Sequence, residues 1–342
     1  MIQYTENASL LSHNTFGMNV KARLLVEYTK EQDLDKIFAD ARVKDLPFLC
    51  IGQGSNLLFT SDFDGVILHG QIKGIRPQAQ YEDVMLVEAG AGETFDDVCA
   101  WAVAHQLYGA ENLSAIPGEV GAAAVQNIGA YGVEFKDLCV AVSAYDIENH
   151  RHVIIGADQC QYGYRTSIFK QPEMKQRFVI TGALLQLRRA SKHHQPEFNL
   201  EYGNMRTALA GKPLTLESVR NAVCDIRAAK LPDPKQLGNA GSFFKNPIIS
   251  RKQYDALRRK WSSMPCYEVD TEFVKVPAGW LIEQAGLKGY QLGGAAVYEK
   301  QCLVLVNKQQ ASPADLVALC QHVVKTVSEK YGINIEPEVN II

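Results

Sequence analysis

The stretch from Ser114 to Glu134 constrains this chain more than any other part of the sequence, because it is built almost entirely of small residues. It carries Gly118, Gly121, Gly129 and Gly132 among alanines, with almost no charge. Such side chains cannot form a core of their own, but they let the backbone approach another surface closely, and glycine enters positive φ at little cost. The stretch alone therefore fits two interpretations, a buried packing segment or one wall of a site for a large flat ligand.

A second glycine loop, Ile-Gly-Gln-Gly-Ser-Asn-Leu at 51–57, favours the ligand site. It follows the apolar run Phe48–Cys50, and a strand that enters such a loop presents consecutive backbone N–H groups suited to a pyrophosphate. Leu57 stands where a dinucleotide fingerprint has its third glycine, and no Gly-Lys-Ser/Thr follows as in a P-loop. In the first stretch, Gln126 and Asn127 add paired hydrogen-bond donors and acceptors.

Length and composition exclude several classes of protein. The 342 residues suffice for two or three domains, and 46% hydrophobic with 21% charged residues fits a soluble enzyme. A net charge of −3 gives no general attraction to nucleic acid or to an anionic membrane. No apolar run reaches membrane-span length, and the first residues lack the signal-peptide pattern. The eight cysteines form no Cys-x-x-Cys pair, which argues against a metal site and predicts reduced thiols in a cytoplasmic protein.

The hydrophobic pattern predicts an α+β fold. We expect a polar lead-in over 1–17 and a mobile crossing between domains over 191–211. Expected strands are Ala22–Tyr28, Pro47–Ile51, Val66–Leu68, Val84–Val87, Leu138–Asp146, His152–Ile155 and Arg177–Leu187. Expected helices are Glu31–Val43, Thr94 to about Gly109, and Thr215–Lys230, which Pro232 and Pro234 end. Beyond this break, helices alternate with short strands in Ser250–Trp261, Pro277–Ala285, Cys302–Val306 and Ser312–Tyr331.

The segment Gly238–Pro247, Gly-Asn-Ala-Gly-Ser-Phe-Phe-Lys-Asn-Pro, is the strongest local signal for chemistry. Its glycines place Ser242 at a tight turn, and Phe243 with Phe244 can pack below while the hydroxyl faces a cleft. A serine that only satisfies a turn is the common alternative, but it does not explain the residues that follow. No Gly-x-Ser-x-Gly elbow is present, so Ser242 is not a hydrolase nucleophile.

Two charged residues, Arg165 and Glu338, are further candidates for the chemistry of the site. Arg165 lies in Tyr164-Arg165-Thr166-Ser167, and a partly buried arginine needs an anionic partner, either the carboxylate of a substrate or an acid of the protein. Glu338 lies in Glu336-Pro337-Glu338-Val339, where a terminal strand can return a carboxylate to the site. A solvated acidic pair is the alternative there.

Together these motifs resemble the type I UDP-N-acetylenolpyruvoylglucosamine reductases, a family in the vanillyl-alcohol-oxidase-like FAD-binding superfamily. The resemblance runs from Asn14-Thr15-Phe16-Gly17 to Val339. It implies a two-part FAD-binding domain and a smaller C-terminal α+β substrate-binding domain. The implied parts are FAD-binding subdomain 1 at 1–75, with a terminal strand 333–342 that returns to the active site, subdomain 2 at 76–230, and the substrate-binding domain at 231–332.

The resemblance also implies an activity, the NADPH-dependent reduction of UDP-N-acetylglucosamine enolpyruvate to UDP-N-acetylmuramate in peptidoglycan precursor synthesis. Arg165 and a protonated Glu338 would stabilise the charge that builds on the substrate, and Ser242 would be the general acid. The FAD would be non-covalent, because neither glycine loop contains His or Cys. NADPH and the substrate would use one cleft in turn, and the protein would be a cytoplasmic monomer without nucleic-acid or membrane partners. A flavin oxidase and a catalytically silent binding module are the alternatives, and the Ser242 and Arg165 motifs argue against both.

The same resemblance assigns contacts residue by residue. Substrate contacts would come from Tyr164, Tyr202, Lys230, Asn246 and Gln301. Relatives often carry hydroxyl-bearing or glycine residues at Ala122 and Ala123, where backbone N–H groups would have to replace side-chain contacts to the FAD phosphates. They often carry a basic residue at Asn340, so a cationic contact to the flavin from that position is lost or supplied elsewhere. Contacts to FAD would come from Gly52, Gln53, Gly54, Ser55, Asn56, Pro117, Gly118, Gly121, Gln126, Asn127, Gly129, Ala130, Tyr131 and Arg227.

Overall fold

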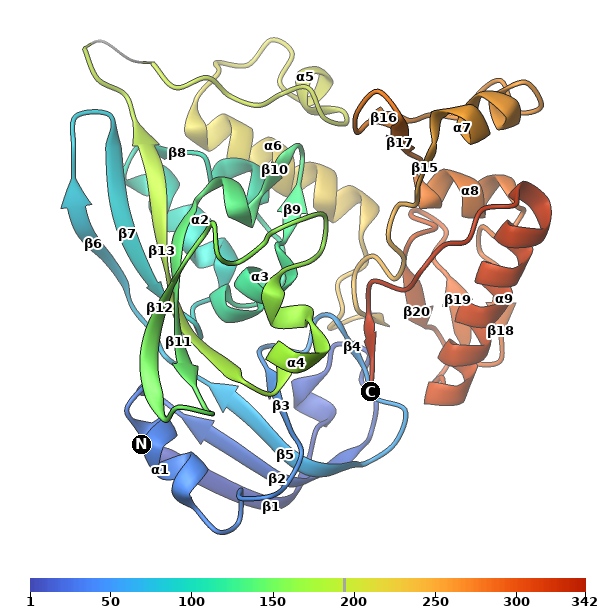
Figure 1. Cartoon of the computed structure of the whole chain (residues 1–342). Coiled ribbons are helices and arrows are strands. Elements are labelled where there is room, and N and C mark those ends of the chain that lie inside the picture. Colours follow the sequence, from blue (N-terminus) through green and yellow to red (C-terminus); the bar gives the residue numbers. More distant parts are fainter. Residues whose placement is uncertain (193–194) are drawn as a thin grey trace. The chain divides into compact units, whose positions relative to one another are not determined.

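The computed structural model of the chain describes residues 1–192 and 195–342, and these form two compact units. Unit 1 contains residues 1–8, 22–53 and 64–229, and unit 2 contains residues 9–21, 54–63 and 230–342. Both units mix helices and strands, which confirms the α+β prediction (Figure 1). Across the described ranges, no helix combines the length and the apolar character needed to span a bilayer.

The first sheet of unit 1 has the order β1-β2-β5-β3, and β3 runs parallel to β5. Alternate residues of β2, such as Leu24 and Val26, are buried in the pattern expected of a sheet with one covered face. Leu34 and Ile37 of helix α1 pack into the same core. The bounds are β1 Ile2–Ser9, β2 Lys21–Tyr28, α1 Asp33–Ala39, β3 Phe48–Ile51 and β5 Phe63–Gly70.

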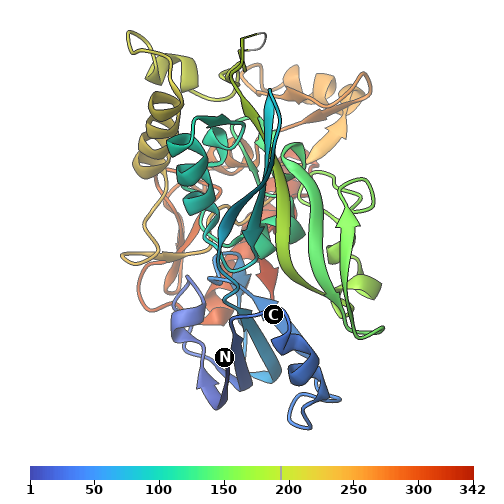
Figure 2. The same cartoon turned by 90° about the vertical axis from the view of Figure 1, so that its left-hand side faces the viewer.

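The second sheet of unit 1 is antiparallel, in the order β12-β11-β13-β7-β6, with β8 paired to β13. Helices α2 and α3 lie on one of its faces, as both views show (Figures 1 and 2). The bounds are β6 Ile75–Gln80, β7 Val84–Gly90, α2 Phe95–Ala104, β8 Leu107–Tyr108, α3 Val120–Gln126, β11 Cys139–Asp146, β12 Arg151–Gly156 and β13 Phe178–Arg189.

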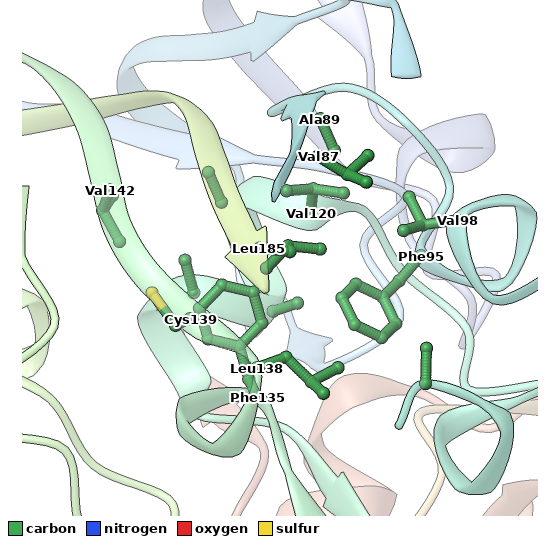
Figure 3. Packing of buried hydrophobic residues seen from close by; sticks show 14 of the residues in the cluster. Val87, Ala89, Phe95, Val98, Val120, Phe135, Leu138, Cys139, Val142 and Leu185 are labelled. Atoms are coloured by element: carbon green, nitrogen blue, oxygen red, sulfur yellow. The ribbon is translucent and has the colours of Figure 1, made fainter. Parts of the chain in front are cut away.

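The core between this sheet and its helices is shown in Figure 3. Phe95 and Val98 of α2, Val120 of α3 and Leu185 of β13 are fully buried and belong to one cluster. The ring of Phe95 lies 6.0 Å, centroid to centroid, from that of Phe135. Burying one such side chain contributes about 1.5–3 kcal/mol, so this core fixes α3 and the glycine-rich stretch against a rigid support.

Helix α6 completes unit 1 with the segment that precedes it. Val219 and Val223 of α6 pack against Met205 and Leu209, so the described part of the expected crossing, 191–192 and 195–211, contains buried residues and a short helix. Residues 193–194 of that crossing lie outside the described ranges. The remaining elements of unit 1 are η2 Glu111–Leu113, β9 Gly129–Ala130, β10 Val133–Glu134, η3 Phe135–Asp137, η4 Ile168–Lys170, α4 Pro172–Lys175, α5 Met205–Ala208 and α6 Leu216–Lys230.

Unit 2 contains a four-stranded sheet, β14-β20-β19-β18, a three-stranded sheet, β15-β17-β16, and a parallel pair of β4 and β21. Its longest helix, α9, begins with a capping box of Ser312 and Asp315 and ends at Gly332 in the left-handed conformation. The bounds are η1 Leu11–His13, β4 Leu57–Leu58, β14 Gly238–Asn239, β15 Ile248–Ser250, α7 Arg251–Arg258, β16 Tyr267–Glu268, β17 Phe273–Lys275, α8 Ala278–Gln284, β18 Gln291–Leu292, β19 Ala295–Val297, β20 Leu305–Asn307, α9 Pro313–Tyr331 and β21 Asn340–Ile341.

Three sequence-based expectations about elements were wrong. The lead-in 1–17 contains strand β1, whose alternation is weak because it is the edge strand of its sheet. Helix α1 ends at Ala39, because Asp40 is extended and its carboxylate binds Arg42. Helix α2 ends at Ala104, since Gln106 has a φ of 56° and the chain continues into β8.

Candidate active site

The glycine loop at 52–53 and the loop before α3 lie together in unit 1, joined by the side chain of Gln53. Its Oε1 accepts from the backbone N–H of Gly118 at 3.2 Å, and its Nε2 donates to Thr94 Oγ1 at 3.2 Å. The two loops are 65 residues apart in the sequence. The side chain of Gln53 therefore sets the separation of the two loops, and both of its polar atoms bind other groups of the protein.

The loop before α3 is also fixed from the side of α6, through the backbone of Ala115. The N–H of Ala115 donates to Asp96 Oδ1 at 2.6 Å, and its carbonyl accepts from Arg227 Nε at 3.1 Å. Asp96 also forms two bonds with Arg220, of 2.6 and 3.0 Å. Ala115 has a φ of 57°, a conformation that costs a non-glycine residue energy and persists only where neighbours enforce it.

Arg227 leaves one positive charge uncompensated beside this loop. Asp96 neutralises Arg220, whereas in residues 1–192 and 195–342 no carboxylate forms an ion pair with Arg227. Burial lowers the pKa of the Arg227 guanidinium below its ordinary value. A desolvated cation at a glycine-rich loop suits an anionic group such as the diphosphate of FAD, so the residues present fit that cofactor.

Arg165 sits at the second position of a tight two-residue turn. Gly163 and Thr166 exchange two backbone hydrogen bonds of 3.1 Å, and Arg165 has a φ of 56°. Turns of type II require positive φ at this position and usually place glycine there. The guanidinium Nη2 donates to the carbonyl of Gly129 at 2.7 Å, and Lys170 Nζ donates to the carbonyl of Arg165 at 3.1 Å. The turn thus aims the guanidinium at the glycine-rich stretch of unit 1.

Gln126 and Asn127, at the end of α3, are held by partners within the protein. Asn127 is fully buried with a φ of 48°; its Nδ2 donates to the carbonyl of Gly163 at 2.8 Å, and its Oδ1 accepts from the N–H of Lys136 at 3.0 Å. Gln126 Oε1 accepts from Lys170 Nζ at 2.7 Å. Asn127 consequently ties the turn of Arg165 to α3, and direct contact of either amide with FAD stays a prediction.

The segment around Tyr202 packs onto the far end of the stretch. Asn199 Nδ2 donates to the carbonyl of Gly132 at 3.0 Å, and Asn112 Nδ2 donates to the carbonyls of Asn199 and Tyr131 at 2.8 Å each. Tyr202 itself is half-buried. The predicted substrate residue Tyr202 therefore lies in a segment bonded to Gly132, which follows the predicted cofactor residue Tyr131.

In unit 2, the segments that carry Ser242 and Glu338 are paired through their backbones. The N–H of Glu338 donates to the carbonyl of Phe243 at 2.7 Å, and the N–H of Lys245 donates to the carbonyl of Glu336 at 2.9 Å. Phe243 is fully buried. Ser242 and Glu338 are both half-buried, so a hydroxyl and a carboxyl flank one short antiparallel pairing that a buried phenyl ring anchors.

Asn56 and Asn340 join the same pairing to the glycine loop of unit 2. Asn56 Nδ2 donates to the carbonyl of Glu338 at 3.4 Å, and its own carbonyl accepts from the N–H and the side chain of Asn340, both at 3.1 Å. Gly54 has a φ of 67° and its carbonyl accepts from the N–H of Thr15 at 3.3 Å. Asn340 serves here as a structural link.

The predicted substrate residues Asn246 and Gln301 both lie against the first turn of α8. Asn246 Oδ1 accepts from the N–H of Ala278 at 2.9 Å. A Cβ added at Gly279 would lie 3.0 Å from Gln301 Oε1. Lys230 is exposed at the end of α6. Two of the three therefore converge within unit 2.

Comparison with known proteins assigns this fold. Residues 22–152 match the family model described as "FAD binding domain", and residues 233–342 match "UDP-N-acetylenolpyruvoylglucosamine reductase, C-terminal domain". The UDP-N-acetylenolpyruvoylglucosamine reductase of Bacteroides fragilis is 50% identical over 335 residues, 98% of each chain. That of Flavobacterium johnsoniae is 42% identical over 100% of each chain. The crystal structure of the corresponding Thermus caldophilus enzyme matches 100% of this chain and 98% of its own, with a TM-score of 0.65 at 20% identity.

The matched FAD-binding domain and the similarity to the reductases thus define an FAD-binding oxidoreductase. At 50% identity over 98% of its length, the chain belongs to the UDP-N-acetylenolpyruvoylglucosamine reductase family. This confirms the resemblance inferred from the motifs.

Several residues that position the site were not found in the sequence. Asp96 and Arg220 hold the loop before α3, and Lys170 holds the turn of Arg165. None of them lies in a motif, so no pattern points to them. Glu119 is different, because it is an acid inside an otherwise nearly uncharged glycine-rich stretch. That contrast with its neighbours could have identified Glu119 from the sequence.

Proposed function

We propose that this chain reduces UDP-N-acetylglucosamine enolpyruvate to UDP-N-acetylmuramate, with NADPH as reductant and a non-covalent FAD. The observation that supports the proposal is the backbone pairing in unit 2, in which the N–H of Glu338 donates to the carbonyl of Phe243, the residue after Ser242. Arg165, whose turn is built to aim its guanidinium, is the third member of the set.

Each of the three residues has a role that follows from its chemistry. FAD, when bound and reduced, supplies a hydride to the terminal carbon of the enolpyruvyl group. Negative charge then develops on the adjacent carbon and its carboxylate, where the Arg165 guanidinium and a protonated Glu338 stabilise it. The Ser242 hydroxyl gives its proton to that carbon. A serine is a weak acid, so it serves only against a strongly basic carbon held close.

The remaining predicted residues bind the two ligands. Gln53 and Arg227, with the glycine-rich segments 51–57 and 114–134, would hold FAD. Tyr164, Tyr202 and Lys230, with Asn246 and Gln301 at the start of α8, would hold the UDP-sugar. We further propose that NADPH and the UDP-sugar use the same cleft in turn, that the protein acts as a monomer in the cytoplasm, and that the three-part division at 75 and 230 describes its functional domains.

The test is Ser242→Ala, with Ser61→Ala as the matched control, since Ser61 is an exposed serine of the same unit. Ser242→Ala is expected to bind FAD and to be bleached anaerobically by NADPH at the wild-type rate. Its turnover of the enolpyruvyl substrate should fall about 10²- to 10⁴-fold, the usual contribution of a general acid. Wild-type turnover in Ser242→Ala would exclude the assigned role, and rapid reoxidation of the bleached protein by air would favour an oxidase instead.

A further inference from the structure

Three titratable side chains of unit 1 form a cluster that the proposed chemistry does not use. His69 of β5 lies between two acids: its Nδ1 is 3.2 Å from Glu27 Oε1, and its Nε2 is 3.6 Å from Glu119 Oε1. The exposed fractions of the three side chains are 13% for His69, 23% for Glu27 and 10% for Glu119. They come from β5, from β2 and from the residue just before α3.

Glu119 connects this cluster to the cofactor loops. A Cβ added at Gly52 would lie 2.7 Å from Glu119 Oε2, so the carboxylate is packed against the backbone of the glycine loop. Glu119 also follows Gly118 directly, and although it is the N-cap residue of α3 its side chain makes no capping bond. The carboxylate therefore stands beside both loops and turns toward His69.

A carboxylate in this position opposes the binding of an anion. The diphosphate of FAD is negative, and two like charges in a poorly solvated site repel each other strongly. With both glutamates ionised, the cluster has a net charge of −1 when His69 is protonated and −2 when it is neutral. His69 is the group whose proton changes the field at the loops, and histidine is the side chain that titrates in the physiological range.

The surroundings of the cluster favour the protonated histidine. Burial opposes its charge, but the bonds and charges of Glu119 and Glu27 outweigh that effect, so the pKa of His69 is raised above its ordinary value. Gln71 Nε2 donates to Glu27 at 2.8 Å and keeps this acid in place.

Three other titratable groups, Tyr28, Cys50 and Glu93, lie on the segments next to the cluster. Tyr28 of β2 is buried, and burial raises the pKa of its hydroxyl well above the ordinary value. Cys50 lies on β3, the strand that pairs with β5. Glu93, before α2, is paired with Lys73 at 3.8 Å.

We propose that protonation of His69 controls the affinity of this protein for FAD, because the imidazolium neutralises Glu119 beside the loops that receive the diphosphate. His69 is thus a positioning residue that acts through Glu119. FAD binding in turn retains the proton on His69, since the effect of two linked ligands on each other is reciprocal.

The direction of the pH dependence follows from this linkage. The dissociation constant of FAD is low and constant below the pKa of His69 in the apoprotein, rises as the pH passes through that pKa, and levels off above the pKa of the holoprotein. If FAD raises the pKa of His69 by one unit, the total rise is about tenfold.

The experiment is a titration of the apoprotein with FAD, followed by flavin fluorescence, from about pH 6 to about pH 9. It compares the wild type with His69→Gln, Glu119→Gln and the double variant. His152→Gln is the matched control, since His152 also faces two acids, Glu31 and Asp35 at 4.0 and 3.9 Å, but its side chain is 36% exposed.

The expected results separate an electrostatic role from a structural one. His69→Gln should bind about tenfold more weakly at low pH and lose the pH dependence. Glu119→Gln and the double variant should bind tightly at every pH, and His152→Gln should follow the wild type. A pH-independent dissociation constant in the wild type, or an unchanged pH profile in Glu119→Gln, would overturn the inference even if His69→Gln failed to fold. Absence of FAD binding at any pH would contradict the flavin-dependent function itself.

Discussion

Replacing Gly54 by alanine tests how closely the glycine loop is held in unit 2. Gly54 has a φ of 67°, and a Cβ added there would lie 2.0 Å from the carbonyl oxygen of His13. This oxygen cannot move away easily, because the buried side chain of Asn14 donates to the carbonyls of Leu10 and Met18 at 2.7 and 3.0 Å. Gly17, in the same unit, is the matched control: its φ is 70° and a Cβ there would have nothing within 4 Å.

The two variants differ only in the contact that the new methyl group makes. An L-residue in the left-handed conformation costs about 1–2 kcal/mol, and the loss of unfolded-state entropy changes stability by a similar amount in both variants. Forcing a methyl group into a packed site adds about 1–3 kcal/mol. We therefore expect Gly54→Ala to be less stable than Gly17→Ala by about 1–3 kcal/mol.

Urea denaturation followed by tryptophan fluorescence measures this difference. In a Trp101→Phe background the two remaining tryptophans, Trp261 and Trp280, both report on unit 2. Equal losses of unfolding free energy in Gly54→Ala and Gly17→Ala would refute the reasoning. They would show that the backbone of His13 moves away from the new methyl group without a measurable loss of stability.

Two further predictions concern unit 1. Leu185→Ala should lower the free energy of unfolding by about 2–5 kcal/mol, because Leu185 is fully buried in the core of Figure 3. The control, Ile154→Ala on the exposed face of β12, should change it by no more than about 0.5 kcal/mol. Equal losses of unfolding free energy in the two variants would contradict the packing. Burial disfavours the charged form of Asp96, but the bonds from Arg220 outweigh it and lower its pKa. The stability that this pair contributes should therefore be present above about pH 4 and be lost as the pH falls. The free energies of unfolding of wild type and Asp96→Asn, measured with urea, should differ at pH 7 by about 1–2 kcal/mol and converge in acid. A constant difference across that range would contradict the assignment.

The sequence placed Ser242 and Glu338 in one site only through the family resemblance. No local pattern joins positions 96 residues apart in a chain, and an acidic pair near the end of a chain is normally solvated. The structure shows how the two segments are joined: Phe243 is buried, and its carbonyl accepts a hydrogen bond from the N–H of Glu338.

Other parts of the site could not be predicted because they depend on conformation. The positive φ of Arg165 is invisible in a sequence, where such turns are recognised by glycine. Helix α3 was not predicted because the glycines of this stretch were interpreted as the sign of a ligand-binding wall. Val120–Gln126 is nevertheless rich in alanine, the best helix former. The edge strand β1 was missed because its face is only partly covered.

The interleaved course of the chain decides how unit 2 can be produced in isolation. A fragment excised at the limits of the C-terminal family match, 233–342, would lack Phe16 and Phe59, both fully buried in the intact unit. The ring of Phe243 would lose its edge contact with Phe16, which lies 6.2 Å away, and Asn307 would lose the carbonyl to which it donates. Such an excised piece would expose apolar surface and be prone to aggregate, so a stable recombinant form of this half needs the two early segments spliced back onto it.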